Sequence, residues 1–336
     1  MLPSLPSCLL GARYDAVEGL FMKKPSVLVS LTTKDNDYQQ EQAAAAEQTA
    51  RRLGVDLQIL FADNDAITQS QQLLKVIQTT SGPRPDFIVF EPAGGTALPQ
   101  VARAAAAAGM GWVVVNRDVE YISDLRRSYR VPIFAVTSDH EEVGRLQGQQ
   151  LAALLPSGGS ILYIQGPAES LAAKQRSAGM YETKPVNIQL KIMKAQWTEE
   201  SAYKTVSSWL RLSTSHETHI DLVAAQDDSM ALGAKKAFQD HTTGPSRDRW
   251  VSLPYTGCDG LPKTGQAWVR SGLLTATVVI PPNTGQAIEM GVQAMRTGTM
   301  PPERSITAVS SFPTIETLAT NQREKNRLLK TTSAGS

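Results

Sequence analysis

The stretch VAAQDDSMALGAKKAFQ, residues 223–239, joins a short apolar run to a helical pattern through three polar residues. The same order recurs along the chain. SVLVSL (26–31) precedes an alanine-rich helical segment that ends at Gly54, and DFIVFEP (86–92) precedes another. Short apolar runs that alternate with helices are typical of βαβ units in parallel sheets. One sheet of about ten strands would be unusually wide, so we predict an α/β fold with two doubly wound parallel-sheet (Rossmann-like) domains.

The composition is that of an ordinary globular protein. Of the 336 residues, 41% are hydrophobic and 19% are charged, and the formal net charge is +1. This balance provides no basic surface for nucleic acid or for an anionic membrane, and no apolar run is long enough to predict a transmembrane helix. Cys8 and Cys258 lack the spacing of a disulfide framework or a redox motif. We therefore expect Cys258 to be a small apolar side chain.

Both ends of the chain differ in pattern from the part between them. The first residues, MLPSLPSCLLGARYDAVEGLF, have neither a basic segment nor a long apolar one, so they do not fit a secretory signal. Met22-Lys23-Lys24 resembles an alternative start directly ahead of the first predicted strand. We expect residues 1–24 to form an irregular N-terminal extension and residues 321–336 to form a C-terminal tail.

Polar side chains stand directly after many of the predicted strands. In open parallel sheets, ligands bind at the carboxyl ends of the strands, because loops and helix N-termini converge there. This rule predicts a site for a polar ligand rather than an apolar one. The residues that it selects include Asn36, Tyr38, Glu91, Asn116, Arg117, Asp139, Trp197, Asp227 and Asp259.

Motifs for cofactors, metals and nucleophilic catalysis are absent from the sequence. There is no G-x-x-x-x-G-K-[ST], no G-x-G-x-x-G after the first strand and no G-x-S-x-G elbow. His216-Glu217-Thr218-His219 lacks zinc-site spacing and a third ligand, so we expect a solvated loop there. We expect no cofactor, no metal and no catalytic residue, with His140 and His241 at the surface or at helix caps.

The adjacent acids Asp227 and Asp228 could suggest an acid–base pair. Neighbours at a strand end more commonly divide their roles, because one side chain caps the following helix while the other points into the cleft. We expect Asp228 or Ser229 to be the cap and Asp227 to face the cleft.

Four segments together resemble the type 1 periplasmic sugar-binding proteins, of the ribose- and galactose-binding kind. They are VVVNRDV (113–119), QGPAESLAAKQRSAGM (165–180), the stretch at 223–239 and YTGCDGLPKTG (255–265). The resemblance extends from about Ser26 to about Thr317. It implies non-catalytic binding of a sugar or polyol between two lobes that close about a three-segment hinge. The lobes would be residues 25–136 plus 281–305 and residues 137–280 plus 306–320, with crossovers near FAVTSD, VVIPPN and PPERSI.

The resemblance also implies which residues bind the ligand. Tyr38 would stack on the sugar, because aromatic faces cover apolar C–H surfaces. Planar amide, carboxylate and guanidinium groups would bind neighbouring hydroxyls. The ligand-binding residues would be Asn36, Tyr38, Gln39, Glu91, Asn116, Arg117, Arg176, Trp197, Asp227 and Asp259.

Several of these positions depart from the family's ribose binders. The family has Asp-Arg where this chain has Asn116-Arg117, and it has Asn where Glu91 stands. Gln39 replaces a second aromatic residue. A pocket with less aromatic cover and an extra carboxylate is suited to a different polyol, a larger or modified sugar, or a ligand with a cationic group.

The resemblance implies a monomer in the periplasm that delivers its solute to an ABC permease or to a membrane chemoreceptor. The absence of a recognisable signal leaves a cytoplasmic location open. The alternative is therefore a cytoplasmic ligand-sensing protein coupled to a regulator or sensor kinase. A small-molecule enzyme of the α/β class is the third possibility.

Overall fold

The computed structural model describes residues 24–80, 82–93, 97–213, 215 and 218–333. The expected N-terminal extension, apart from Lys24, lies outside the described residues, as do Cys8, His216 and Glu217. In the described part of the chain, every helix is too short or too polar to cross a membrane.

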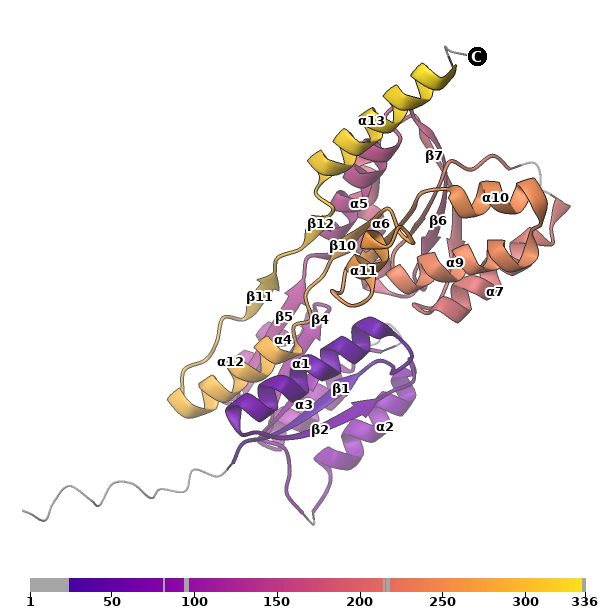
Figure 1. Ribbon diagram of the computed structural model, residues 1–336. Coiled ribbons are helices and arrows are strands. Elements are labelled where there is room, and N and C mark those ends of the chain that lie inside the picture. Colours follow the sequence, from indigo (N-terminus) through magenta and orange to yellow (C-terminus); the bar gives the residue numbers. More distant parts are fainter. Residues whose placement is uncertain (1–23, 81, 94–96, 214, 216–217, 334–336) are drawn as a thin grey trace, which may run out of the picture.

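Two sheets of six strands each, counted over the described residues, form two lobes (Figure 1). All pairs are parallel except that of β12 with β10. The predicted pair of doubly wound α/β domains is confirmed. The first sheet has the order β11 (Arg304–Thr307), β5 (Ile133–Ser138), β4 (Gly111–Asn116), β3 (Phe87–Phe90), β1 (Ser26–Leu31), β2 (Asp56–Phe61). The second has the order β12 (Ser310–Phe312), β10 (Ala276–Val279), β9 (Tyr255–Asp259), β8 (Leu222–Ala225), β6 (Gly159–Gln165), β7 (Ile188–Lys194).

Helices cover both faces of the first sheet, because alternate residues of its buried strands point to opposite sides. In β3, Phe87 and Val89 pack with the side that holds α1 (Asp37–Leu53) and α12 (Thr284–Thr297). Ile88 and Phe90 pack on the other side, beneath α2 (Ala66–Ile77), α3 (Pro99–Ala107) and α4 (Ile122–Ser128).

The second sheet is covered in the same way. Leu162 and Ile164 of β6 pack toward α7 (Glu199–Leu210), α9 (Asp228–His241) and α10 (Gly244–Ser252). Ile161 and Tyr163 pack toward α5 (His140–Leu154), α6 (Leu171–Thr183) and α13 (Ile315–Ser333). The short α11 (Gly265–Arg270) follows β9.

The chain passes between the lobes three times. It crosses after β5, after β10 through residues 280–283, and between β11 and β12 at residues 308–309. The third crossing lies beyond PPERSI, where it was expected, because β11 occupies the end of that stretch and remains in the first sheet. At the C-terminus, α13 begins at Ile315 and continues through much of the segment expected to be a tail.

The backbones of α5 and α6 are in contact. This contact positions Arg176 of α6 next to the space between the two lobes. A Cβ atom at Gly144 would lie 2.1 Å from the carbonyl oxygen of Arg176, and one at Gly179 would lie 1.9 Å from the carbonyl oxygen of Glu141. Only glycine permits so close an approach without a shift of one helix.

The substitution Gly179→Ala is therefore expected to lower the free energy of unfolding by about 1–3 kcal/mol, because its methyl group overpacks the contact of α6 with α5. Chemical denaturation measures this effect. Lys174→Ala, at an exposed position of the same helix, should change stability by less than about 0.5 kcal/mol. Equal stabilities of the two variants would contradict the packing argument.

Candidate ligand-binding site

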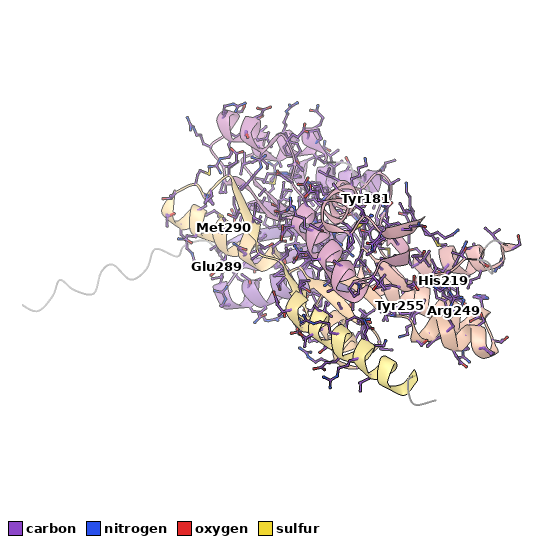
Figure 2. All side chains as sticks on the ribbon, turned by 90° about the horizontal axis from the view of Figure 1, so that it is seen from above. Tyr181, His219, Arg249, Tyr255, Glu289 and Met290 are labelled. Carbon is purple, nitrogen blue, oxygen red and sulfur yellow. The ribbon has the colours of Figure 1, made fainter. Side chains whose placement is uncertain are left out.

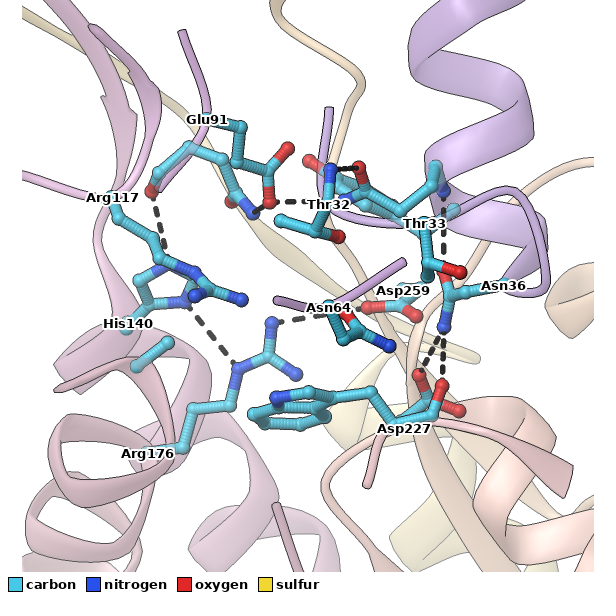
Figure 3. Close-up of a pocket in the computed structure, with 15 residues that line it drawn as sticks. Thr32, Thr33, Asn36, Asn64, Glu91, Arg117, His140, Arg176, Asp227 and Asp259 are labelled. Atoms are coloured by element: carbon cyan, nitrogen blue, oxygen red, sulfur yellow. Dashed lines mark hydrogen bonds and ion pairs between the residues drawn. The ribbon is translucent and has the colours of Figure 1, made fainter. Parts of the chain in front are cut away.

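One pocket between the lobes brings together all ten residues that the resemblance selects (Figure 3). The first lobe provides Asn36, Tyr38, Gln39, Glu91, Asn116 and Arg117, and the second lobe provides Arg176, Trp197, Asp227 and Asp259. The remaining lining residues are Thr32, Thr33, Asn64, His140 and Ala172.

Glu91 is the centre of the first-lobe wall. Its side chain is 0% exposed. Gln39 Nε2 and Asn116 Nδ2 both donate to Glu91 Oε1, at 2.9 and 2.8 Å. Burial raises the pKa of Glu91, and the positive charge of Arg117 opposes that shift. Glu91 Oε2 has no hydrogen-bond partner among the described residues.

Arg176 organises the second-lobe wall. Its guanidinium lies 3.8 Å from a carboxylate oxygen of Asp259 and 5.3 Å from the centroid of the Trp197 ring. It also donates to the carbonyl oxygen of Gln226. Burial raises the pKa of Asp259, as does the charge of Asp227, and Arg176 acts in the opposite direction. The Trp197 ring thus lines the pocket with the guanidinium of Arg176 over one of its faces.

His140 lies inside the pocket wall, so its expected place at the surface or at a cap is wrong. It is buried as the first residue of α5, directly after the chain has crossed between the lobes. The cap of α5 is Asp139. His140 Nε2 donates to the carbonyl oxygen of Asn116 at 3.0 Å, and its Nδ1 accepts from Arg176 Nε at 3.4 Å. Burial lowers the pKa of His140, and Arg176 adds to that effect, so the ring is neutral.

Hydrogen bonds join the two lobes across the pocket. Asn36 Nδ2 donates to the carbonyl oxygen of Trp197 at 2.7 Å and to Asp227 Oδ2 at 2.9 Å. At the rim, Ser229 Oγ donates to Asp37 Oδ1 at 2.8 Å. These contacts link residues 161 to 192 positions apart in the chain. The lobes are therefore closed on one another in this structure.

The roles of the two adjacent acids differ from those expected. Asp227 is itself the cap of α9, because its Oδ1 accepts from the Met230 backbone N–H at 2.9 Å. The prediction that Asp228 or Ser229 caps this helix is wrong, since α9 begins at Asp228. Asp228 is buried and accepts from the Gly260 backbone N–H at 2.8 Å and from Thr277 Oγ1 at 2.7 Å. It holds the loop that follows β9.

Asp227 therefore combines a cap with a contact to the pocket. Burial, and to a lesser degree the charge of Asp37 on the facing lobe, raise its pKa to about 7. Its hydrogen bonds from Met230 and Asn36 act in the opposite direction.

Three predicted site residues have left-handed backbone conformations. The φ angles are +64° at Asn116, +61° at Trp197 and +101° at Asp259. Such conformations are costly for residues other than glycine and cluster at functional sites. Asn64, which also lines the pocket, has φ +59°. Asn64 was missed in the sequence, although it follows β2 and the strand-end rule could have found it.

Tyr38 lines the pocket and also reaches the second crossover. Its hydroxyl lies 3.4 Å from the carbonyl oxygen of Pro281, which accepts from it. The ring packs with Val278 and Ile280 in the cluster beside the crossings. Tyr38 thus connects the pocket to the segment about which the lobes are joined.

Comparison with known proteins relates the chain to solute-binding proteins. Residues 27–299 match the family model described as periplasmic binding protein domain. The chain is 29% identical to a putative rhizopine-binding protein of Rhizobium meliloti over 204 residues, which are 59% of this chain and 61% of that protein. It is 24% identical to the ribose import binding protein of Escherichia coli over 260 residues, covering 76% and 79% of the two chains.

The fold also matches a solved structure. The crystal structure of a galactofuranose binding protein superposes with a TM-score of 0.73 at 22% sequence identity. The match covers 90% of this chain and 99% of that one. At this level of identity the match shows a shared fold.

The repulsion between Asp37 and Asp227 generates a pH dependence. The pKa of Asp227 is raised from an ordinary 3.8 to about 7, so the folded chain binds this proton more tightly than the unfolded chain does. Its contribution to stability is complete below about pH 4 and is lost as the pH rises to about 7. Asp37→Asn removes one cause of the shift. The stability of this variant relative to wild type should rise by about 1 kcal/mol between pH 4 and pH 7.

Denaturation curves at several pH values measure this difference. Asp63→Asn removes an exposed carboxylate outside the pocket, and its stability relative to wild type should stay constant over the same range. A constant difference for Asp37→Asn as well would show that the two acids do not interact.

Proposed function

Because the chain belongs to the periplasmic binding protein domain family, we propose that it binds a small polyhydroxylated solute, a sugar or polyol, in the pocket between its lobes. The match of residues 27–299 to the family model confirms, at the level of the family, the resemblance that four segments of the sequence indicate. The relatives named above include a ribose import binding protein. Binding without chemical conversion of the solute is the activity that such a relationship supports.

One observation carries this proposal. Three buried polar atoms of the pocket residues, Glu91 Oε2, Asn116 Oδ1 and Arg117 Nε, have no hydrogen-bond partner among the described residues. Buried polar atoms are nearly always paired in folded proteins. Two acceptors and one donor on the same wall match adjacent hydroxyl groups, because each hydroxyl both donates and accepts.

A partner protein recognises the closed form of the two lobes. A ligand that contacts both lobes favours the closed state by its differential affinity for that state. The three crossings permit a hinge motion of the lobes, in which the sheet that holds β5 and β11 and the sheet that holds β10 and β12 are the moving units. We propose that the protein acts in the periplasm. Its proposed partner is an ABC permease that accepts the closed form. The alternative of a cytoplasmic sensing protein is less favoured, because the relatives include import proteins.

A thermal-shift screen with pentoses, hexoses, polyols and their amino derivatives is expected to find a saturable stabilisation by one class. A hundredfold excess of ligand over Kd stabilises the bound protein by about 2.7 kcal/mol. The absence of any shift across such a panel would contradict the proposed function.

With a ligand from that screen, Arg117→Met is expected to weaken binding at least about tenfold, because methionine preserves the apolar stem but cannot donate a charge-assisted hydrogen bond. Isothermal titration calorimetry measures the loss. Arg103→Met, at an exposed position of α3 outside the pocket, is the matched control and should bind as wild type does. Unchanged affinity of Arg117→Met would remove Arg117 from the binding site.

A further inference from the structure

The carboxylate of Glu91 lacks a positive partner. Both of its hydrogen bonds come from neutral amides, those of Gln39 and Asn116, and both go to Oε1. Among the described residues, no Lys, Arg or His nitrogen forms an ion pair with Glu91 within 4.0 Å. Buried carboxylates are normally paired with a cation. Glu91 Oε2 thus lines the pocket as an unpaired acceptor.

The guanidinium of Arg117 forms its hydrogen bond with a backbone carbonyl and not with Glu91. Arg117 donates to the carbonyl oxygen of Pro92 at 2.8 Å, while its Nε has no partner among the described residues. The positive charge of Arg117 opposes the rise in the pKa of Glu91, but the two side chains form no ion pair. Both side chains lie on the wall of the pocket (Figure 3).

The opposite wall adds further acidic groups to the pocket. Asp227 and Asp259 are buried there, and Asp37 lies at the rim beside Asp227. The guanidinium of Arg176 pairs with Asp259. Three buried acids and Asp37 at the rim therefore accompany two guanidiniums, and only one ion pair forms among the described groups of the pocket. A positive charge on the ligand would favour the ionised form of an unpaired acid.

On the premise of the function proposed above, we propose that the ligand carries a protonated amine beside its hydroxyl groups, and that Glu91 Oε2 binds this ammonium. The chemical class is an amino sugar or an aminocyclitol. The ammonium supplies the missing cation through a charge-assisted hydrogen bond. Arg117 Nε donates to a hydroxyl oxygen of the same ligand. An orientation that placed the ammonium beside Arg117 is disfavoured, because the two positive charges would repel one another.

Matched ligands test this proposal on the wild-type protein. Calorimetry compares galactose with galactosamine and N-acetylgalactosamine, and scyllo-inositol with scyllo-inosamine, at a pH at which the amines are protonated. At least one amine should bind at least tenfold more tightly than its neutral parent, and N-acetylation should remove this gain because it removes the charge. Neutral parents that bind as tightly as the amines would overturn the inference and leave the proposed function intact. If neither class binds, the proposed function also fails.

The variant Glu91→Gln locates the effect. Glutamine has nearly the shape of glutamate, and its oxygen can still accept from Gln39 and Asn116, so the melting temperature of the variant serves as the check on folding. Affinity for the amine should fall at least tenfold, while affinity for the neutral parent should stay within about threefold. Glu289→Gln is the control, because Glu289 lies on α12 (Figure 2) and is not among the residues that line the pocket. An equal loss for amine and neutral ligands in Glu91→Gln would overturn the assignment.

Discussion

The closed arrangement depends on a hydrogen bond between two helix caps. Asn36 caps α1 through its Oδ1, which accepts from the Gln39 backbone N–H at 3.1 Å, and its Nδ2 donates to Asp227. Asp227 caps α9 through Oδ1 and accepts from Asn36 through Oδ2. Each side chain thus uses one atom for its own helix and the other for the facing lobe. The N-termini of α1 and α9 meet at the pocket, and the two side chains that cap these helices also bond to one another across it.

This arrangement explains why acidic side chains gather in a buried space. Helix N-termini favour negative charge, and loops at the carboxyl ends of both sheets converge on the same volume. Asp227 and Asp259 are accordingly buried close to one another, and Arg176 offsets part of their charge from a helix held by backbone contact with α5. Left-handed backbone at Asn116, Trp197 and Asp259 aims the side chains of these residues into that volume.

Much of the site could be predicted from the strand-end rule and the family resemblance, because both act on residues that are near one another in sequence. The predictions were wrong where they depended on the exact residue at which a helix begins or on contacts with residues far away in the sequence. Asp228 was expected to be a cap, yet its partners are Gly260 and Thr277, which lie on other elements. His140 was expected at the surface, but the crossing after β5 places it against Asn116 and Arg176.

The sequence by itself determined the alternation of strands and helices, the division into two α/β lobes and the polar character of the strand ends. These are local properties of apolar periodicity and chain direction. Only the tertiary structure decided that Glu91 has amide partners but no cation, that Asp227 both caps α9 and bonds Asn36, and that the third crossing follows β11. The physical reason is that charge compensation and hydrogen-bond pairing depend on atoms that folding brings from distant parts of the chain.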